Sequence, residues 1–152
     1  YSAHCDAAFR AKLALPADAP VALVNETLDL LAAQQVDFTL FFTRLTDAAA
    51  TGDAAPLAEL FSDAGEFHAW HTSGQGHARP AVLLPAMLAA NPVLIPRNHL
   101  IERAIHAANG GDFSVFHRLA EAWQHPFSRA AAADLQAAPL PQEKVHQTFC
   151  GT

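Results

Sequence analysis

The chain has 152 residues, 51% of them hydrophobic and 16% charged, which suffices for one folded domain with its own core. Its net charge of −6 excludes a general nucleic-acid or anionic-membrane binder, since such proteins need a positive surface. Two cysteines are too few for a disulfide scaffold, and no apolar run approaches the ~20 residues that cross a bilayer. Because the chain starts without Met and without a signal pattern, we expect it to be part of a longer protein.

The first half of the chain is predicted to be helical, because its apolar residues recur at helical spacing between prolines. Residues 2–14 form the first predicted helix, and Pro20 can open the second. The stretch 36–50 is rich in aromatic and β-branched residues, as strands are, but its apolar spacing fits a helix better. Short helices are predicted over 56–61 and in a following segment that Asp63 can cap.

The middle of the chain is predicted to begin with a loop, because residues 72–79 are rich in glycine and polar side chains. Pro80 can open a helix that reaches Ala90. Pro85 lies within that helix, where it removes a backbone donor and clashes one turn back, so we expect a kink or a break there.

Two stronger helices are predicted next, over 99–108 with Asn98 as cap and over 113–124 with Asp112 as cap. Each carries one apolar face, to which Phe113 contributes. The expected fold class is therefore all-α, with about seven short to medium helices.

Beyond Pro126 the helical pattern fades into an alanine-rich turn over 130–137 and an extended tail. The predicted organisation is a helical domain over 1–127 and an irregular, extended C-terminal arm over 128–152.

The nine histidines raise the alternative of a metal-binding domain. The sets with suitable spacing are His68 with His71 and His77, and His99 with Glu102 and His106. A zinc site needs three or four ligands, and no H-E-x-x-H pattern occurs. Surface or packed histidines are the favoured interpretation, and no metal ligand is predicted.

Phosphate-binding motifs are not found in the sequence. Asp112-Phe113-Ser114 differs by one residue from the D-F-G of kinases, but it follows two glycines and opens a helix, so we interpret it as a cap. With Lys12 and Lys144 as the only lysines, lysine-based phosphate chemistry has almost no place in this chain.

The two cysteines are predicted to differ. Cys5 lies in the first helix beside alanines and is expected to be packed as a small residue. Cys150 lies third from the end, where oxidants and other thiols can reach it, although its reactivity depends on its thiolate fraction. The residues alone favour an inert terminal cysteine, and they give no specific support to a bridge between the two.

Several segments resemble, in family order, blocks of the selenoprotein O (SelO) family. The N-P-x-x-(I/V)-x-R-N-(H/Y) block is matched by Asn91, Pro92, Ile95, Arg97, Asn98 and His99. The later G-D-(F/Y), P-(F/Y) and T-F-C-G-T patterns are matched by 111–113, 126–127 and 148–152. The K-L-G-L and V-D-(F/Y)-T patterns are matched by 12–15 and 36–39, with two departures: Ala14 replaces a glycine and Thr43 stands where arginine is common.

This resemblance implies a kinase-like parent protein that transfers AMP from ATP to Ser, Thr or Tyr hydroxyls of proteins, with Mg²⁺ or Mn²⁺. Its nucleotide- and metal-binding residues belong to an N-terminal part, so this chain is similar to the C-terminal helical portion and has no catalytic, cofactor-binding or metal residues of its own. Cys150 matches the position of the family's selenocysteine, which implies a redox role and a disulfide with the kinase-like part. The roles of Asn91, Pro92, Arg97 and Asn98 are left open.

The leading hypothesis is therefore a non-catalytic helical region that packs on the kinase-like part of the same polypeptide and presents a redox-active thiol. Protein substrates of the parent are the other expected partners, without nucleic acid or membrane, and the bacterial cytoplasm is the expected location. An apolar face exposed by excision, for which the phenylalanines of 38–42 and parts of 113–123 are the candidates, would favour self-association. The alternatives are an autonomous helical protein-interaction module and the histidine-based metal-binding domain.

Overall fold

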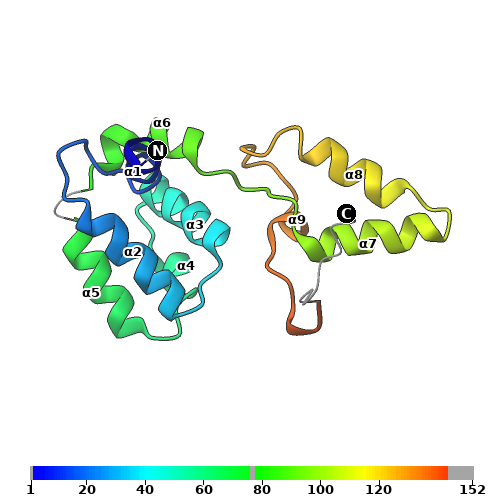
Figure 1. The fold of residues 1–152 in the computed structure, drawn as a ribbon, viewed down its shortest axis with the longest axis horizontal. Coiled ribbons are helices and arrows are strands. Elements are labelled where there is room, and N and C mark those ends of the chain that lie inside the picture. Colours follow the sequence, from blue (N-terminus) through cyan, green and yellow to red (C-terminus); the bar gives the residue numbers. More distant parts are fainter. Residues whose placement is uncertain (1, 76–77, 144–152) are drawn as a thin grey trace. The chain divides into compact units, whose positions relative to one another are not determined.

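The computed structural model describes residues 2–75 and 78–143, and within these ranges it contains helices and no strand (Figure 1). The predicted all-α class is therefore confirmed. The elements are α1 Ser2–Lys12, α2 Ala22–Ala33, α3 Phe38–Thr51, α4 Ala55–Ala58, α5 Ala64–Gln75, α6 Pro80–Ala90, α7 Asn98–Asn109, α8 Ser114–Ala122, α9 Ala133–Gln136 and the 3₁₀ turn η1 Pro141–Glu143.

Two predictions about the middle of the chain are wrong in part. Helix α5 continues to Gln75, so residues 72–75 of the predicted loop are helical, whereas residues 78–79 lie outside any helix. Phe67 and Trp70 pack against the core, and this packing outweighs the weak helix propensity of the residues that follow them. Helix α6 runs through Pro85 without a break. Pro85 removes only the bond to the carbonyl of Ala81, which lies in the exposed first turn of the helix.

The predicted helix caps are confirmed at one position and displaced at two. Asp63 Oδ1 accepts hydrogen bonds from the backbone N–H groups of Gly65 and Glu66, at 2.8 and 3.1 Å. Asp112 Oδ1 accepts from Ser114 N at 2.9 Å, but α8 starts at Ser114, one residue later than predicted. Asn98 is wrong as a cap, because it is itself the first residue of α7.

The described chain divides into two compact units, 1–92 and 93–152. In the first unit α1 and α3 both pack against α6, and α2 lies beside α5 (Figure 1). The last part of the predicted arm, 144–152, lies outside the described residues, and the predicted boundary between a domain over 1–127 and an arm over 128–152 stays a prediction. No helix of the described ranges is long and apolar enough to cross a bilayer.

Aromatic rings form the centre of the first unit. Phe41 is fully buried, and its ring meets the rings of Phe42, Phe61 and Trp70 edge to face, with centroids 5.0, 6.0 and 5.4 Å apart. Phe67 is also buried and extends this cluster from α5. The aromatic stretch that resembled a strand in the sequence is thus the core-facing side of α3.

Two helices of the first unit end in a left-handed residue that is not glycine. Ala14 follows α1 with φ of 53°, and Gln35 follows α2 with φ of 52°. In this conformation a Cβ approaches the backbone closely, so glycine is the usual residue there. This explains why the family pattern has glycine where this chain has Ala14.

Replacing Gln35 with Gly should raise the free energy of unfolding by about 0.5 kcal/mol, because the relief of left-handed strain exceeds the added backbone entropy of the unfolded chain. Gln35 is exposed, so the change removes little packing. Ala33→Gly, in the last turn of α2, is the matched control and should lower stability by about 1 kcal/mol. Urea unfolding measures both, and a loss of stability in Gln35→Gly would contradict the interpretation.

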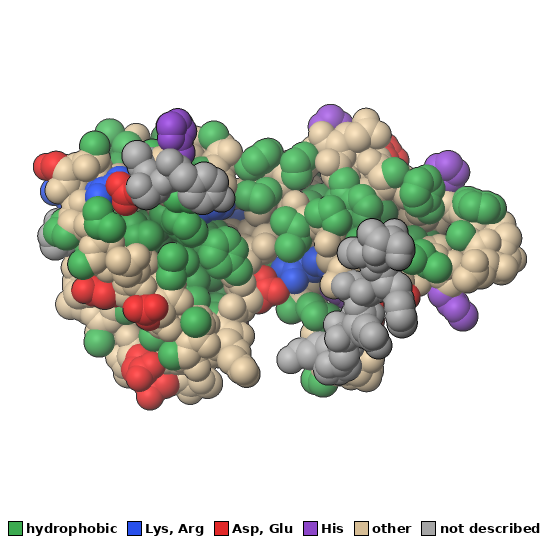
Figure 2. Space-filling model, viewed as in Figure 1, with side chains coloured by type: hydrophobic (Ala, Val, Ile, Leu, Met, Phe, Trp, Pro, Cys, Tyr) green, Lys and Arg blue, Asp and Glu red, His purple; other side chains and the backbone are tan. Residues whose placement is uncertain are grey.

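The second unit has a small core beneath a helix hairpin. Helices α7 and α8 pack side by side (Figure 1). Its buried apolar residues are Val93, Leu94, Leu100, Ala104, Leu119 and Leu135. The predicted apolar face of α8 is only partly buried, since Phe113 and Phe116 are more than half exposed while Leu119 is buried. Ile105 of α7 is also exposed, and Figure 2 shows hydrophobic side chains on the surface of this unit.

Candidate functional site

Asn91, the first residue of the motif that the sequence singled out, joins three helices. Its side chain is fully buried at the end of α6. Its Nδ2 donates to the backbone oxygen of Lys12 at 3.1 Å and to Thr46 Oγ1 at 2.8 Å. Its Oδ1 accepts from Lys12 Nζ at 3.2 Å. Asn91 therefore ties α1 and α3 to the end of α6.

Lys12 completes this network. Its ammonium donates to the backbone oxygen of Ala90 at 2.7 Å and lies 5.0 Å from the centroid of the Phe42 ring. Burial lowers the pKa of the Lys12 amine from its usual value, because the charged form loses hydration. Lys12 is the one lysine among the described residues, and these contacts hold its ammonium group within the network.

Pro92 follows directly and ends the first unit. Its ring restricts Asn91 to an extended conformation, with φ of −112° and ψ of 90°, so α6 ends there. The Pro92 carbonyl accepts a hydrogen bond from Thr43 Oγ1 at 3.4 Å. Thr43 is the buried residue that replaces the family's common arginine, and here it belongs to the packing of α3.

The rest of the motif begins the second unit. The backbone N–H groups of Val93 and Leu94 donate to the carbonyl of Pro126, at 2.8 and 3.1 Å. Arg97 is buried and is the N-cap residue just before α7, while Asn98, the first residue of the helix, is exposed. The four motif residues therefore do not converge on one site: Asn91 and Pro92 belong to one unit, and Arg97 and Asn98 to the other.

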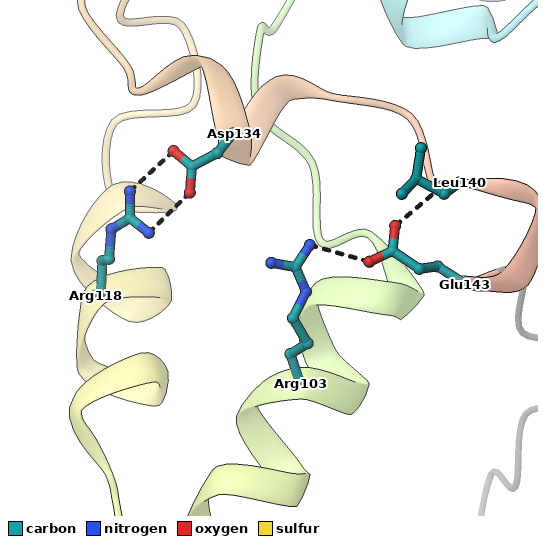
Figure 3. Close-up of polar contacts among 5 residues, drawn as sticks. All are labelled: Arg103, Arg118, Asp134, Leu140 and Glu143. Atoms are coloured by element: carbon teal, nitrogen blue, oxygen red, sulfur yellow. Dashed lines mark hydrogen bonds and ion pairs between the residues drawn. The ribbon is translucent and has the colours of Figure 1, made fainter.

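Two arginines of the hairpin bind the segment that follows it (Figure 3). Arg118 of α8 makes a two-pronged ion pair with Asp134 of α9, at 2.8 and 2.9 Å. Arg103 of α7 lies 3.4 Å from Glu143, whose second oxygen accepts from the backbone N–H of Leu140 at 3.0 Å. The sequence did not point to these pairs, since their partners are 16 and 40 residues apart.

His99 is buried at the start of α7, close to this charged group. Burial is the main cause that lowers the pKa of its imidazole, the charges of Arg103 and Arg97 lower it further, and that of Glu143 raises it. The neutral form is therefore the one that the folded second unit favours.

The stability of the second unit should fall as the pH drops below 6.5, the ordinary pKa of histidine. Below that pH the unfolded chain binds a proton at His99, whereas the lowered pKa keeps His99 neutral in the folded unit. Proton binding therefore stabilises the unfolded state relative to the folded one. His99→Gln should flatten the dependence, and His106→Gln, an exposed histidine of the same helix, should leave it unchanged. Unfolding between pH 7.5 and 5.5, followed by Trp123 fluorescence in a Trp70→Phe chain, measures this. An equal slope in wild type and His99→Gln would refute the assignment.

The histidine sets that the sequence suggested for a metal are not assembled. The His71 ring stacks on Phe67, with centroids 5.4 Å apart, and its pKa is lowered by burial and by the charge of His68. His77 lies outside the described residues. His99 is buried, whereas Glu102 and His106 are exposed. Among the residues that the structure describes, no three His, Cys, Asp or Glu side chains form a group that could hold a metal ion.

The cysteines give one correction. Cys5 is exposed and free, not packed as predicted, because the residues of α1 that pack against the core start one turn later, at Phe9. Cys150 lies outside the described residues, so its redox role and its pairing stay predictions.

The chain is similar over its length to proteins named protein nucleotidyltransferase YdiU. It is 37% identical to the protein of Cereibacter sphaeroides and 39% identical to that of Mycolicibacterium paratuberculosis, in both cases over the whole chain and 32% of the relative. Identity to the Nitrobacter hamburgensis protein is 42% over 95% of the chain and 30% of the relative. No family model matches the chain.

The chain thus spans about a third of the length of the curated relatives it matches. This agrees with the expected correspondence to a C-terminal part of the family's proteins. The resemblance is thereby confirmed: over its whole length this chain is homologous to part of the YdiU protein nucleotidyltransferases of the selenoprotein O family.

Proposed function

We propose that this chain is the non-catalytic, helical C-terminal region of a SelO-type protein adenylyltransferase. The whole protein would transfer AMP from ATP to Ser, Thr or Tyr hydroxyls of protein substrates, with Mg²⁺ or Mn²⁺, in the bacterial cytoplasm. The observation that carries the proposal is homology over the entire chain to a third of proteins named nucleotidyltransferases. The buried network of Asn91 and Lys12 supports it, because these polar groups serve packing.

The packing role is supported by the surface of the second unit. Phe113 and Phe116 are exposed on a hairpin whose own core is small. Apolar side chains gathered at a surface mark an interaction site more often than scattered ones do. The kinase-like part of the same polypeptide is the proposed cover. Without it, the same side chains would favour self-association of the isolated chain.

Cys150 is proposed as a redox-active thiol of the whole protein. It would pair with a cysteine of the kinase-like part: the two thiols lose two protons and two electrons to an oxidant such as glutathione disulfide, and one S–S bond forms. In the isolated chain that partner is missing, so Cys150 should stay reactive towards a thiol reagent. A Cys5→Ser chain isolates its reaction, because Cys5 is itself exposed.

The transfer proposal is tested with labelled ATP, Mn²⁺ or Mg²⁺ and an acceptor protein. The full-length protein should attach labelled AMP to the acceptor, whereas the 152-residue chain should attach none. A second protein, which lacks the region that corresponds to this chain, is assayed alone and with the 152-residue chain added. The difference in AMP transfer measures whether the region supports activity. Label transferred by the isolated chain, or none by the full-length protein, would refute the proposal.

A further inference from the structure

A cavity of about 380 Å³ lies in the first unit, among α2, α3, α5 and α6. Its size falls within the range of small-molecule sites, which starts at about 300 Å³. Small residues at the end of α3 leave the space open, because Ala48 and Ala49 of the helix and Gly52, which follows it, line the pocket. Large apolar side chains form much of the remaining wall, among them Leu13, Leu15, Leu45, Trp70 and Met87.

The polar side chains in the described wall are Thr27, His71 and Ser73, and no charged side chain lines it. The Thr27 hydroxyl donates to the backbone oxygen of Leu23 at 2.7 Å and accepts from Trp70 Nε1 at 2.9 Å. Ser73 Oγ donates to the backbone oxygen of Trp70 at 2.9 Å. Burial lowers the pKa of His71, so its ring favours the neutral form. A charged ligand group would lose its hydration here and find no opposite charge.

We propose that this cavity is a binding site for a compact, uncharged, apolar molecule, such as an aromatic ring system or a short acyl group. The pocket is partly open to solvent and most of its wall is apolar, so an apolar ligand seated there would remove that wall from water. The proposal does not depend on the nucleotidyltransferase function, since every wall residue belongs to the first unit.

The test uses the 152-residue chain and N-phenyl-1-naphthylamine, an uncharged probe that brightens in apolar surroundings and accepts energy from tryptophan. Trp70 lines the cavity, whereas Trp123 belongs to the second unit. In a Trp123→Phe chain, saturable binding of one probe molecule should quench Trp70. Absence of binding would overturn the proposal.

Two cavity-filling variants locate the probe. Ala48→Leu and Ala49→Leu should each weaken binding by about tenfold or more while the chain stays folded. Phe116→Ser, which removes an exposed apolar side chain of the second unit, is the control and should bind like wild type. Undiminished binding in both filled variants, or a loss in Phe116→Ser, would overturn the proposal. Unfolding of both filled variants would overturn it as well, because a real void accommodates the added carbons.

Discussion

Replacing Phe41 with Ala should destabilise the first unit by about 4 kcal/mol, the largest single-residue effect that we expect. The substitution removes a fully buried ring from the middle of an aromatic cluster in which Phe42, Phe61 and Trp70 all contact it edge to face. The loss combines the transfer of the ring to water with the cavity that it leaves. Urea unfolding followed by Trp70 fluorescence in a Trp123→Phe chain reports on this unit alone.

The matched control is Phe38→Ala, three residues earlier on the same helix. Phe38 is 45% exposed and touches Phe9 and Phe42 at the edge of the cluster. Its removal should cost about 1 kcal/mol, because less apolar area leaves the protein interior. Similar losses for the two variants would show that Phe41 is not at the centre of the core.

The second large effect is expected at Asn91. Asn91→Ala should lower the free energy of unfolding of the first unit by about 3 kcal/mol. It removes one acceptor and two donors at once, and it leaves the carbonyl of Lys12 and the hydroxyl of Thr46 without their hydrogen bonds from Asn91 Nδ2. The same Trp70 measurement applies.

Asn98→Ala is the control for this prediction, because it changes the same residue type within the same motif. Asn98 is exposed, and its replacement should alter stability by less than about 0.5 kcal/mol. The difference between the two losses distinguishes Asn91, which we expect to stabilise the fold, from Asn98 of the same motif, which we expect not to. A loss below about 1 kcal/mol for Asn91→Ala, the value of one ordinary hydrogen bond, would contradict the proposed network.

Local patterns in the sequence were sufficient for much of the fold. Apolar spacing predicted a helix over 36–50, which is observed as α3 over Phe38–Thr51, and it predicted α7 to within a residue of its observed start, because one buried helix face repeats every three to four residues. Asp63 was a reliable start signal, since its carboxylate satisfies backbone donors two and three residues later.

Local signals failed where packing competed with them. The polar, glycine-containing end of α5 is helical because Phe67 and Trp70 hold that helix on the core. Pro85 leaves α6 unbroken, since the bond that it removes begins in an exposed turn. The left-handed conformation of Ala14 could be suspected only from the glycine that the family pattern has at that position.

The sequence by itself determined the helical class and the family, because amphipathic spacing and ordered motifs are properties of the chain read linearly. It left the roles of the motif residues open, and only the tertiary structure shows what Asn91 contacts. Asn91 meets Lys12 and Thr46 across 79 and 45 residues, and the two halves of the motif fall in different units. Such contacts depend on how helices pack, and a hydrogen bond between distant side chains leaves no periodic trace in the sequence.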